Sequence, residues 1–250
     1  MRIFDRLEHP VLHVTINGSL VDKRPLTFEL ITDKGFPSVV SRLRFAADSG
    51  TGREGDKVTV NLSYDDYEAL LFTGTIYDAA IHGAFRDLAL TDSYKKLCDT
   101  TIAAAYRKEM ANIILRDTLE AAGINDTAVT CPEVELARFS TRKITADEII
   151  VKLIKALQEH GYTGLRFFFD EKDVFHFGTS RDTGKNEGEA FAFETGKTIF
   201  KKSAGKIEVL PLPIRHTRDI TVDDTPVITS RTALYLSGSR SRLALWLEAP

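Results

Sequence analysis

The amino-acid sequence predicts a mixed β and α/β (α+β) fold, in which two antiparallel β regions flank a small α/β segment. Short apolar-rich runs separated by turn residues fill both ends of the chain. Between them lie a stretch without Gly or Pro and a capped amphipathic segment, both with a helical pattern. With 250 residues, 43% hydrophobic and 28% charged, the chain can bury a full core in one or two domains.

Residues 1–92 are predicted to form a first β-barrel. Asn17-Gly18 and the Gly35-Phe36-Pro37 break supply turns, and residues 40–46 and 57–62 alternate apolar and polar side chains as half-buried strands do. Short strands connected by such turns are typical of a compact antiparallel barrel or sandwich. The expected strands are residues 11–16, 26–31, 40–46, 57–62, 70–77 and 84–90.

Residues 93–188 are predicted to form an α/β domain with two helices and an aromatic hairpin. Residues 106–122 contain neither Gly nor Pro, which indicates a helix that ends at Gly123. The second helix starts at a capping box made by Thr145 and Glu148. We expect its apolar face, built on Ile149, Leu153 and Leu157, to pack on a hairpin of residues 167–177. The polar stretch 178–188 indicates a loop and a domain boundary.

Residues 189–250 are predicted to form a second β-barrel. The chain contains no strict sequence repeat, but the similar strand count of the two β regions suggests two related barrels that lie side by side, with the α/β segment docked outside them. The expected strands are residues 190–193, 198–200, 206–210, 219–222, 233–236 and 243–247.

The distribution of charge excludes one class of function. The net charge is −4 for residues 1–92, −1 for 93–180 and +2 for 181–250, which gives the overall −3. None of these is the strong basic field that nucleic-acid binding needs, so we expect no sequence-specific nucleic-acid partner. No apolar run approaches the roughly 18 residues of a membrane span, and charges begin at Arg2. We therefore expect a soluble protein, without a membrane partner, made in a cytoplasm.

The cysteines and histidines show no metal-ligand spacing. Cys98 and Cys131 belong to no C-x-x-C pair and are expected to be two small buried thiols. No H-E-x-x-H motif occurs, and we expect the histidines to be surface or interface residues. We predict no metal and no cofactor. The six histidines are His9, His13, His82, His160, His176 and His216.

One segment matches the sequence pattern of a phosphate-binding loop. Residues 50–55 read Gly-Thr-Gly-Arg-Glu-Gly, which fits G-x-G-x-x-G. The phosphate-binding version needs a helix N-terminus directly after the third glycine. Here residues 56–60 continue as a strand, so the motif indicates a flexible hairpin loop. No nucleophile motif such as G-x-S-x-G occurs either, and we assign no catalytic residue.

Several segments together resemble the baseplate hub proteins of phage tails. Residues 71–78 look like the strand that closes the family's first barrel, with its apolar-x-Gly-x-apolar pattern around Gly74. A strand and a helix in residues 102–122, the capped helix 144–162 and the hairpin 167–178, with its acidic turn, are similar to the elements that follow in the family. Residues 237–245 look like the last hairpin of the second barrel. The family is the late-control-gene-D type, which is related to the hub portion of type VI secretion spike proteins.

The resemblance covers most of the chain and implies a structural role. Hubs of this family are homotrimers in which each subunit contributes two tail-tube-like barrels. The six barrels form a ring that matches the sixfold tail tube to the threefold spike. The resemblance implies tail tube, spike and tape measure proteins as partners, a place in the virion tail baseplate, synthesis in the bacterial host cytoplasm, and no enzymatic activity. Lumen-facing side chains should be polar and should lack a single deep pocket.

The chain departs from the family in being shorter than most members and in ending at Pro250, directly after a strand. We therefore expect the spike to attach to the barrel surface or through a separate protein.

Two alternatives from other classes stay open at this point. An α+β hydrolase with a site assembled only in three dimensions would show a concave pocket with perturbed carboxylates or histidines. A cytosolic barrel that binds a peptide or an oligonucleotide would show a basic groove with exposed aromatic residues. Residues 167–169, three consecutive Phe, could supply such a platform, but their acidic neighbours favour core packing.

Overall fold

The computed structural model describes residues 10–64, 67–179, 191–238 and 240–249. Strands make up 56% and helices 15% of the structure, so the fold is mostly β with antiparallel sheets. The chain divides into two compact units. We call the described part of residues 1–92 and 184–250 the sheet unit and that of residues 93–183 the insert unit. Among the described helices, none has the length and apolar character to cross a membrane.

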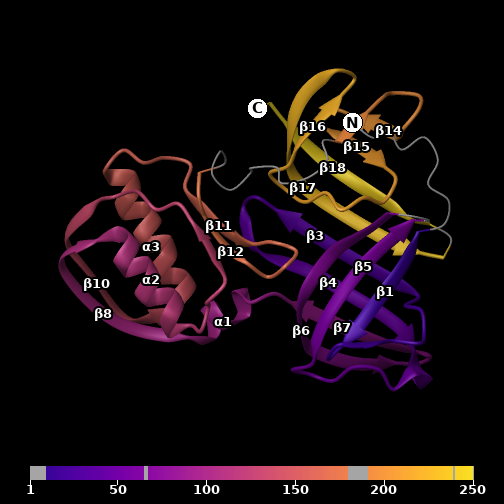
Figure 1. The fold of residues 1–250 in the computed structure, drawn as a ribbon, viewed down its shortest axis with the longest axis horizontal. Coiled ribbons are helices and arrows are strands. Elements are labelled where there is room, and N and C mark those ends of the chain that lie inside the picture. The colour runs from indigo at the N-terminus through magenta and orange to yellow at the C-terminus, as the bar shows by residue number, and fades with distance from the viewer. Residues whose placement is uncertain (1–9, 65–66, 180–190, 239, 250) are drawn as a thin grey trace. The chain divides into compact units, whose positions relative to one another are not determined.

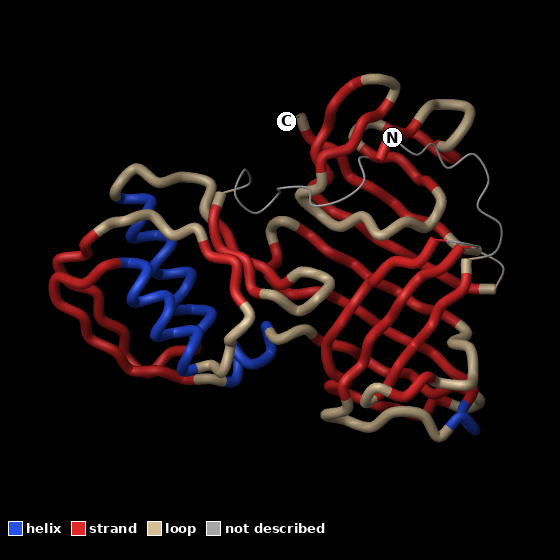
Figure 2. The backbone as a smooth tube through the Cα atoms, viewed as in Figure 1, coloured by secondary structure: helices blue, strands red, loops and turns tan. Residues whose placement is uncertain are grey.

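The sheet unit is built on one large sheet of 13 strands (Figures 1 and 2). Its main path runs β14-β15-β18-β17-β3-β4-β7-β6-β5-β1-β2, and β13 and β16 pair beside β17. The N-terminal strands are β1 (Val11–Ile16), β2 (Ser19–Leu20), β3 (Thr27–Asp33), β4 (Phe36–Ala46), β5 (Lys57–Tyr64), β6 (Tyr67–His82) and β7 (Phe85–Thr91). The C-terminal strands are β13 (Phe191–Phe193), β14 (Ile199–Ser203), β15 (Lys206–Val209), β16 (Asp219–Val222), β17 (Thr225–Ser237) and β18 (Arg242–Glu248).

The core of the sheet unit draws on both β regions. Strands β3 and β5 bury every second side chain, because alternate residues of a strand point to opposite faces. Phe28, Phe45 and Leu245 are all 0% exposed and belong to one hydrophobic cluster. The hydroxyls of Thr32 and Thr232 lie 2.9 Å apart in this core, so the N- and C-terminal regions also share a buried hydrogen bond.

The two β regions repeat one strand topology. The order β3-β4-β7-β6-β5-β1 in the N-terminal lobe has the counterpart β14-β15-β18-β17-β16-β13 in the C-terminal lobe, with the strands in the same chain order. A bulge between Ile76 and Asp78 in the β6–β7 pair matches a bulge between Thr229 and Arg231 in the β17–β18 pair. One pairing differs, because β1 is antiparallel to β5 whereas β13 is parallel to β16.

The two lobes are fused by the antiparallel pairing of β17 with β3, which extends from Arg231–Asp33 to Ser237–Thr27. Because of this pairing, the described strands form one open sheet without a closed barrel. The α+β class predicted from the sequence is supported, while the two separate barrels are not confirmed.

The insert unit places helices between two small sheets (Figure 1). Strands β8 and β10 form a two-stranded ribbon, and β11, β12 and β9 form the other sheet. Its elements are α1 (Tyr94–Asp99), β8 (Thr101–Met110), α2 (Ala111–Ala121), β9 (Thr127–Val129), β10 (Glu135–Thr145), α3 (Ala146–Glu159), β11 (Arg166–Phe169) and β12 (Phe175–Gly178).

Helix α3 packs as the sequence predicts. Thr145 and Glu148 form the capping box, in which the Glu148 carboxylate accepts the Thr145 amide at 3.1 Å. Ile149, Leu153 and Leu157 are buried in one cluster with Phe167, Phe169, Phe175 and Phe177 of the hairpin. The expected contact between the helix face and the hairpin is confirmed.

The helix predicted over residues 106–122 is shorter in the structure than expected. Helix α2 begins at Ala111, and residues 101–110, expected to be helical from Tyr106, form strand β8 instead. The reason is tertiary, because β8 pairs with β10, a strand that the sequence did not predict. The expected loop and boundary at residues 178–188 falls almost entirely on residues 180–190, which lie outside the described part of the chain.

Asp170 holds the turn of the aromatic hairpin. Its carboxylate accepts the backbone amides of Lys172 and Val174, each at 2.9 Å, and lies 2.9 Å from Nε2 of His176. The His176 ring is stacked on Phe168 with the ring centroids 5.0 Å apart. Burial raises the pKa of Asp170, but the hydrogen bonds from His176 and the amides outweigh burial and lower this pKa below its usual value.

Asp170→Asn is expected to lower the free energy of unfolding of the insert unit by about 1 to 3 kcal/mol at neutral pH, because the charged acceptor is lost. A depressed pKa stabilises the fold above the unfolded-state value of about 4, and this stabilisation is lost as the pH falls through the folded-state pKa. The difference between variant and wild type should therefore vanish in acid. Urea unfolding at a series of pH values measures it, with exposed Asp126→Asn as the control. A difference that stays constant with pH would contradict the ionised role of Asp170.

Candidate functional site

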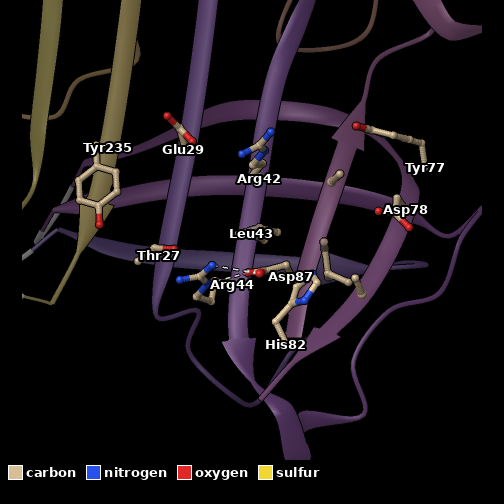
Figure 3. Close-up of a pocket in the computed structure, with 13 residues that line it drawn as sticks. Thr27, Glu29, Arg42, Leu43, Arg44, Tyr77, Asp78, His82, Asp87 and Tyr235 are labelled. Carbon is tan, nitrogen blue, oxygen red and sulfur yellow. Dashed lines mark hydrogen bonds and ion pairs between the residues drawn. The ribbon is translucent and has the colours of Figure 1, made fainter. Parts of the chain in front are cut away.

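The most extensive functional candidate is the polar face of the sheet unit, which we call the outer face. It consists of the side chains of β17, β3, β4, β7 and β6 that point away from the core (Figure 3). In β4, Leu43 and Phe45 are buried, whereas Arg42 and Arg44 alternate with them and are exposed. The alternation that builds the core therefore also lines up charged side chains on the opposite side of the same strands.

A hollow of about 390 Å³ lies on this face. It is lined by acidic, basic and aromatic side chains from all five strands, among them Glu29, Arg42, Tyr77, His82 and Tyr235 (Figure 3). The lining contains neither Ser nor Cys, the usual nucleophiles of acyl transfer.

The best-defined contact in the hollow is the pair Arg44–Asp87. The two residues are cross-strand neighbours on β4 and β7, and the guanidinium donates two hydrogen bonds to the carboxylate, at 2.6 Å from Nε and 3.0 Å from Nη2. The Arg44 guanidinium also lies over the Phe85 ring, 5.1 Å from its centroid. The hydrogen bond from Arg44 lowers the pKa of Asp87, and the same pair raises the pKa of Arg44. Asp87 therefore stays ionised at neutral pH, as an ion-pair partner and not a proton donor.

A second row of contacts crosses the junction of the two lobes. Lys206 on β15 and Arg231 on β17 lie over the Trp246 ring from β18, at 4.7 and 5.0 Å from its centroid. Nε of Arg231 is 3.9 Å from a carboxylate oxygen of Asp33 on β3. Such exposed contacts each contribute at most about 1 kcal/mol. Their effect is to balance charge locally, so the outer face has no strong field of either sign.

The glycine-rich motif is a loop, as the sequence predicts. A short 3-10 helix (Ala47–Ser49) precedes it, and β5 begins at Lys57 after it, with no helix N-terminus to receive a phosphate. Gly52 has φ of +75°, and a Cβ there would lie 2.6 Å from the Ile76 side chain. Glycine is needed at this position for both backbone conformation and packing.

Two expectations about histidine and cysteine are wrong. His216 is 5% exposed, so it is not a surface residue. Its backbone amide donates a hydrogen bond to Oγ1 of Thr32, which is itself buried in the core. Cys98 and Cys131 are free thiols that are only partly buried. Burial raises the pKa of both thiols, that of Cys131 to about 11, so neither favours the reactive thiolate.

The remaining histidines are spread over separate elements. His13 lies on β1, His82 at the end of β6, His160 after α3 and His176 on β12, while His9 lies outside the described residues. Within the described part of the chain, no group of three or more His, Cys, Asp or Glu is placed to hold a metal ion.

Sequence reasoning missed the outer face as a unit. The strand alternation indicated that residues such as Arg42 and Arg44 are exposed, but their partners come from strands far away in the chain. Asp87 lies 43 residues from Arg44, and the strands that join the two lobes, β17 and β3, lie about 200 residues apart in the chain. Strand register decides these contacts, and a single sequence does not reveal it.

No family model matches this sequence, and no curated protein matches it either. Solved structures do match over nearly the whole chain. The 43 kDa tail protein of prophage MuSo2 from Shewanella oneidensis aligns with a TM-score of 0.72 at 10% identity, covering 97% of this chain and 98% of that one. A tail protein from Neisseria meningitidis MC58 gives a TM-score of 0.69 at 10% identity, with 96% of each chain covered.

A third similar structure is an E. coli protein described as a component of the type VI secretion system, with structural similarity to the bacteriophage T4 tail proteins gp27 and gp5. It aligns with a TM-score of 0.71 at 12% identity, covering 95% of this chain and 76% of that one. The chain thus has the fold of prophage tail proteins, and the resemblance to phage tail hub proteins is confirmed at the level of the fold.

Proposed function

We propose that this chain is the structural baseplate hub of a phage or phage-like tail. Three copies form a ring that joins the sixfold tail tube to the threefold spike, with the tail tube, spike and tape measure proteins as partners. In this proposal, residues 1–92 and 189–250 supply two tail-tube-like lobes, residues 93–188 form an insert, and the chain has no enzymatic role. It is made in the bacterial host cytoplasm and ends up in the baseplate of the virion tail.

One observation carries this proposal: Ile81 is exposed where its counterpart in the other lobe is buried. The matching bulges align Ile81 on β6 with Leu234 on β17. Leu234 is 2% exposed and pairs with Leu30 of β3, which covers that side of β17. Ile81 is 59% exposed. The edge of β6 that corresponds to the β3-paired edge of β17 has no partner beyond Thr75 among the described strands, and this leaves Ile81 uncovered.

The missing partner is available at the end of the same sheet. Strand β14 occupies in the C-terminal lobe the place that β3 has in the N-terminal lobe, and β14 is the last strand on its side of the described sheet. Phe200 on β14 is 62% exposed. We infer that β14 of one copy lies along β6 of the next, as β3 lies along β17 within the chain. Such a head-to-tail contact closes a ring of three chains with six similar lobes, and it removes two exposed strand edges.

The outer face suits the wall of the ring's opening. Opposite charges are neighbours across its strands, as ion pairs in Arg44–Asp87 and Arg231–Asp33 and as cross-strand partners in Glu29 and Arg42, so neither an acidic nor a basic polymer is held strongly. Its hollow has a mainly polar lining. A wall of this kind lets a tape measure protein or transported material pass without a binding step.

The mass of the chain in solution tests this function. Sedimentation equilibrium should give three times the 27.9 kDa chain mass, because a ring interface of this type buries more than about 2,000 Å² and is obligate. A monomer that binds a small molecule stoichiometrically in the Arg44–Asp87 hollow would contradict the hub and favour the hydrolase alternative.

A further inference from the structure

The ribbon formed by β8 and β10 gathers unpaired positive charge. It carries five cations and two acids, a net charge of +3, although residues 93–180 together have −1. All five cations are exposed. Within the described residues none of them has an ion pair or a hydrogen bond, whereas Lys95 and Arg116 on nearby helices each pair with an acid four residues on. The cations are Arg107, Lys108, Arg138, Arg142 and Lys143.

Two of these cations oppose each other at close range. Arg107 and Arg138 are direct cross-strand partners. The amide of Ala104 points toward β10, where it donates a hydrogen bond to Oγ1 of Thr141 at 3.2 Å. Because successive residues of a strand point their backbone groups to opposite edges, residues 105 and 107 point theirs away from β10. Their pairs with β10 are therefore the ones without backbone hydrogen bonds. Side chains of such pairs are the closest on a sheet, with Cα atoms about 4.5 Å apart. Like charges placed this way destabilise the ribbon, and a bound carboxylate would remove the repulsion.

The far edge of β8 is open. In the described structure, β8 pairs only with β10, and alternation turns the backbone N–H and C=O groups of Ala103 and Ala105 away from β10. The far edge of β10 is covered at the Ser140 carbonyl, which accepts a hydrogen bond from Lys152 on α3. The side chains along the β8 edge are small, so another backbone can approach closely.

We propose that β8 binds an extended acidic segment of a partner protein, which adds to the β8–β10 ribbon as a third strand. Backbone hydrogen bonds to residues 103–107 would provide affinity, and an acidic side chain of the added strand would lie beside Arg107. The long side chain of Arg138 on β10 would reach toward the same acid across β8, two strand spacings or about 10 Å away. Arg142 lies four residues beyond Arg138, about 13 Å along the strand, where it would meet a second acidic residue. Charged residues also protect strand edges from aggregation, but that role does not require two like charges opposite each other.

A protein segment fits this surface better than single-stranded nucleic acid does. Nucleic-acid grooves stack bases on exposed aromatic side chains. The aromatic residues of the ribbon, Tyr106 and Phe139, pack against each other with centroids 6.4 Å apart, and both belong to the core shared with the helices. The outer side of the ribbon presents Ala103, Ala105 and Ser140 instead.

The test uses the full chain and a fluorescein-labelled heptapeptide of alternating glutamate and valine, with binding followed by fluorescence anisotropy at low salt. The double variant Arg107→Glu with Arg138→Glu should weaken binding by about tenfold or more, because two attractions become repulsions. Lys155→Glu, which makes the same change at an exposed site on α3, should leave binding unchanged. Ala105→Pro removes an amide on the free edge and should abolish binding while leaving the β8–β10 pairing intact.

Far-UV circular dichroism checks that each variant is folded, and Ala103→Pro replaces Ala105→Pro if the latter unfolds. The proposal is overturned if wild type does not bind the peptide at millimolar concentration. It is also overturned if the charge variant or the proline variant binds the peptide as wild type does. Tighter binding of an oligo-dT strand, lost in the charge variant but kept in the proline variant, would instead assign the surface to nucleic acid. Self-association that the proline variant abolishes would assign the edge to a second copy of this chain, and would also overturn the proposal.

Discussion

Leu153→Ala is expected to lower the free energy of unfolding of the insert unit by about 2 to 5 kcal/mol, through loss of buried apolar surface and formation of a cavity. Leu153 is 0% exposed, in one cluster with Phe169 and Phe175 of the hairpin. The three α-helices of the described residues all lie in the insert unit, so urea unfolding followed by circular dichroism at helix wavelengths reports on it. Trp246, the single Trp of the chain, lies in the sheet unit, and its fluorescence transition should not shift.

Val151→Ala is the matched control, since Val151 lies on the same helix and is 42% exposed. Its substitution should change the free energy of unfolding by less than about 0.5 kcal/mol. A value that small for Leu153→Ala would show that the face of α3 is not buried against the hairpin.

Ile81→Lys and Phe200→Lys are each expected to convert the proposed trimer into monomers. Both side chains are exposed apolar groups at strand edges that the proposed contact covers, with 59% and 62% of their surface accessible in the single chain. Burying an unpaired ammonium there should cost at least about 2 kcal/mol at every interface, and the ring has three such interfaces. Sedimentation velocity of each variant measures the loss.

Phe36→Lys separates an edge effect from a general effect of surface charge. Phe36 is 71% exposed but begins β4, where it pairs with Asp33 of β3 and lies on neither the β6 nor the β14 edge, so the trimer should persist. Trimers that survive in both edge variants would rule out the β6–β14 contact. Equal loss of the trimer in all three variants would show that the effect does not come from these edges.

The strands with one buried face could be predicted from the sequence, because burial imposes a period of two. Residues 11–16 and 219–222 form strands with the expected bounds, and β5 begins at Lys57 as expected. Helix α3 was predictable because its capping box and apolar face agree. Local preference and tertiary structure favour the same conformation in these elements.

The ribbon could not be predicted from the local preferences of its residues, for the opposite reason. Strand β8 contains three consecutive Ala, a good helix former, and buries no side chain fully. Strand β10 is bulged between Thr141 and Ile144, which breaks the alternation that would have identified it. Only their mutual pairing and the packing of the helices make these segments strands.

The repeated topology is also invisible at the level of residues. Ile81 and Leu234 occupy corresponding places, but Asp78 corresponds to Arg231 at the equivalent bulge. A β lobe keeps its fold as long as apolar volume and alternation are kept, so the two lobes need no common sequence. The charged pairs of the outer face follow from strand register, which the sequence leaves open.

Electron microscopy of the purified chain shows directly whether this fold assembles into a ring. Ring assembly predicts particles with threefold symmetry, six similar lobes and a central opening. Particles the size of a single chain, or assemblies without a central opening, would contradict it.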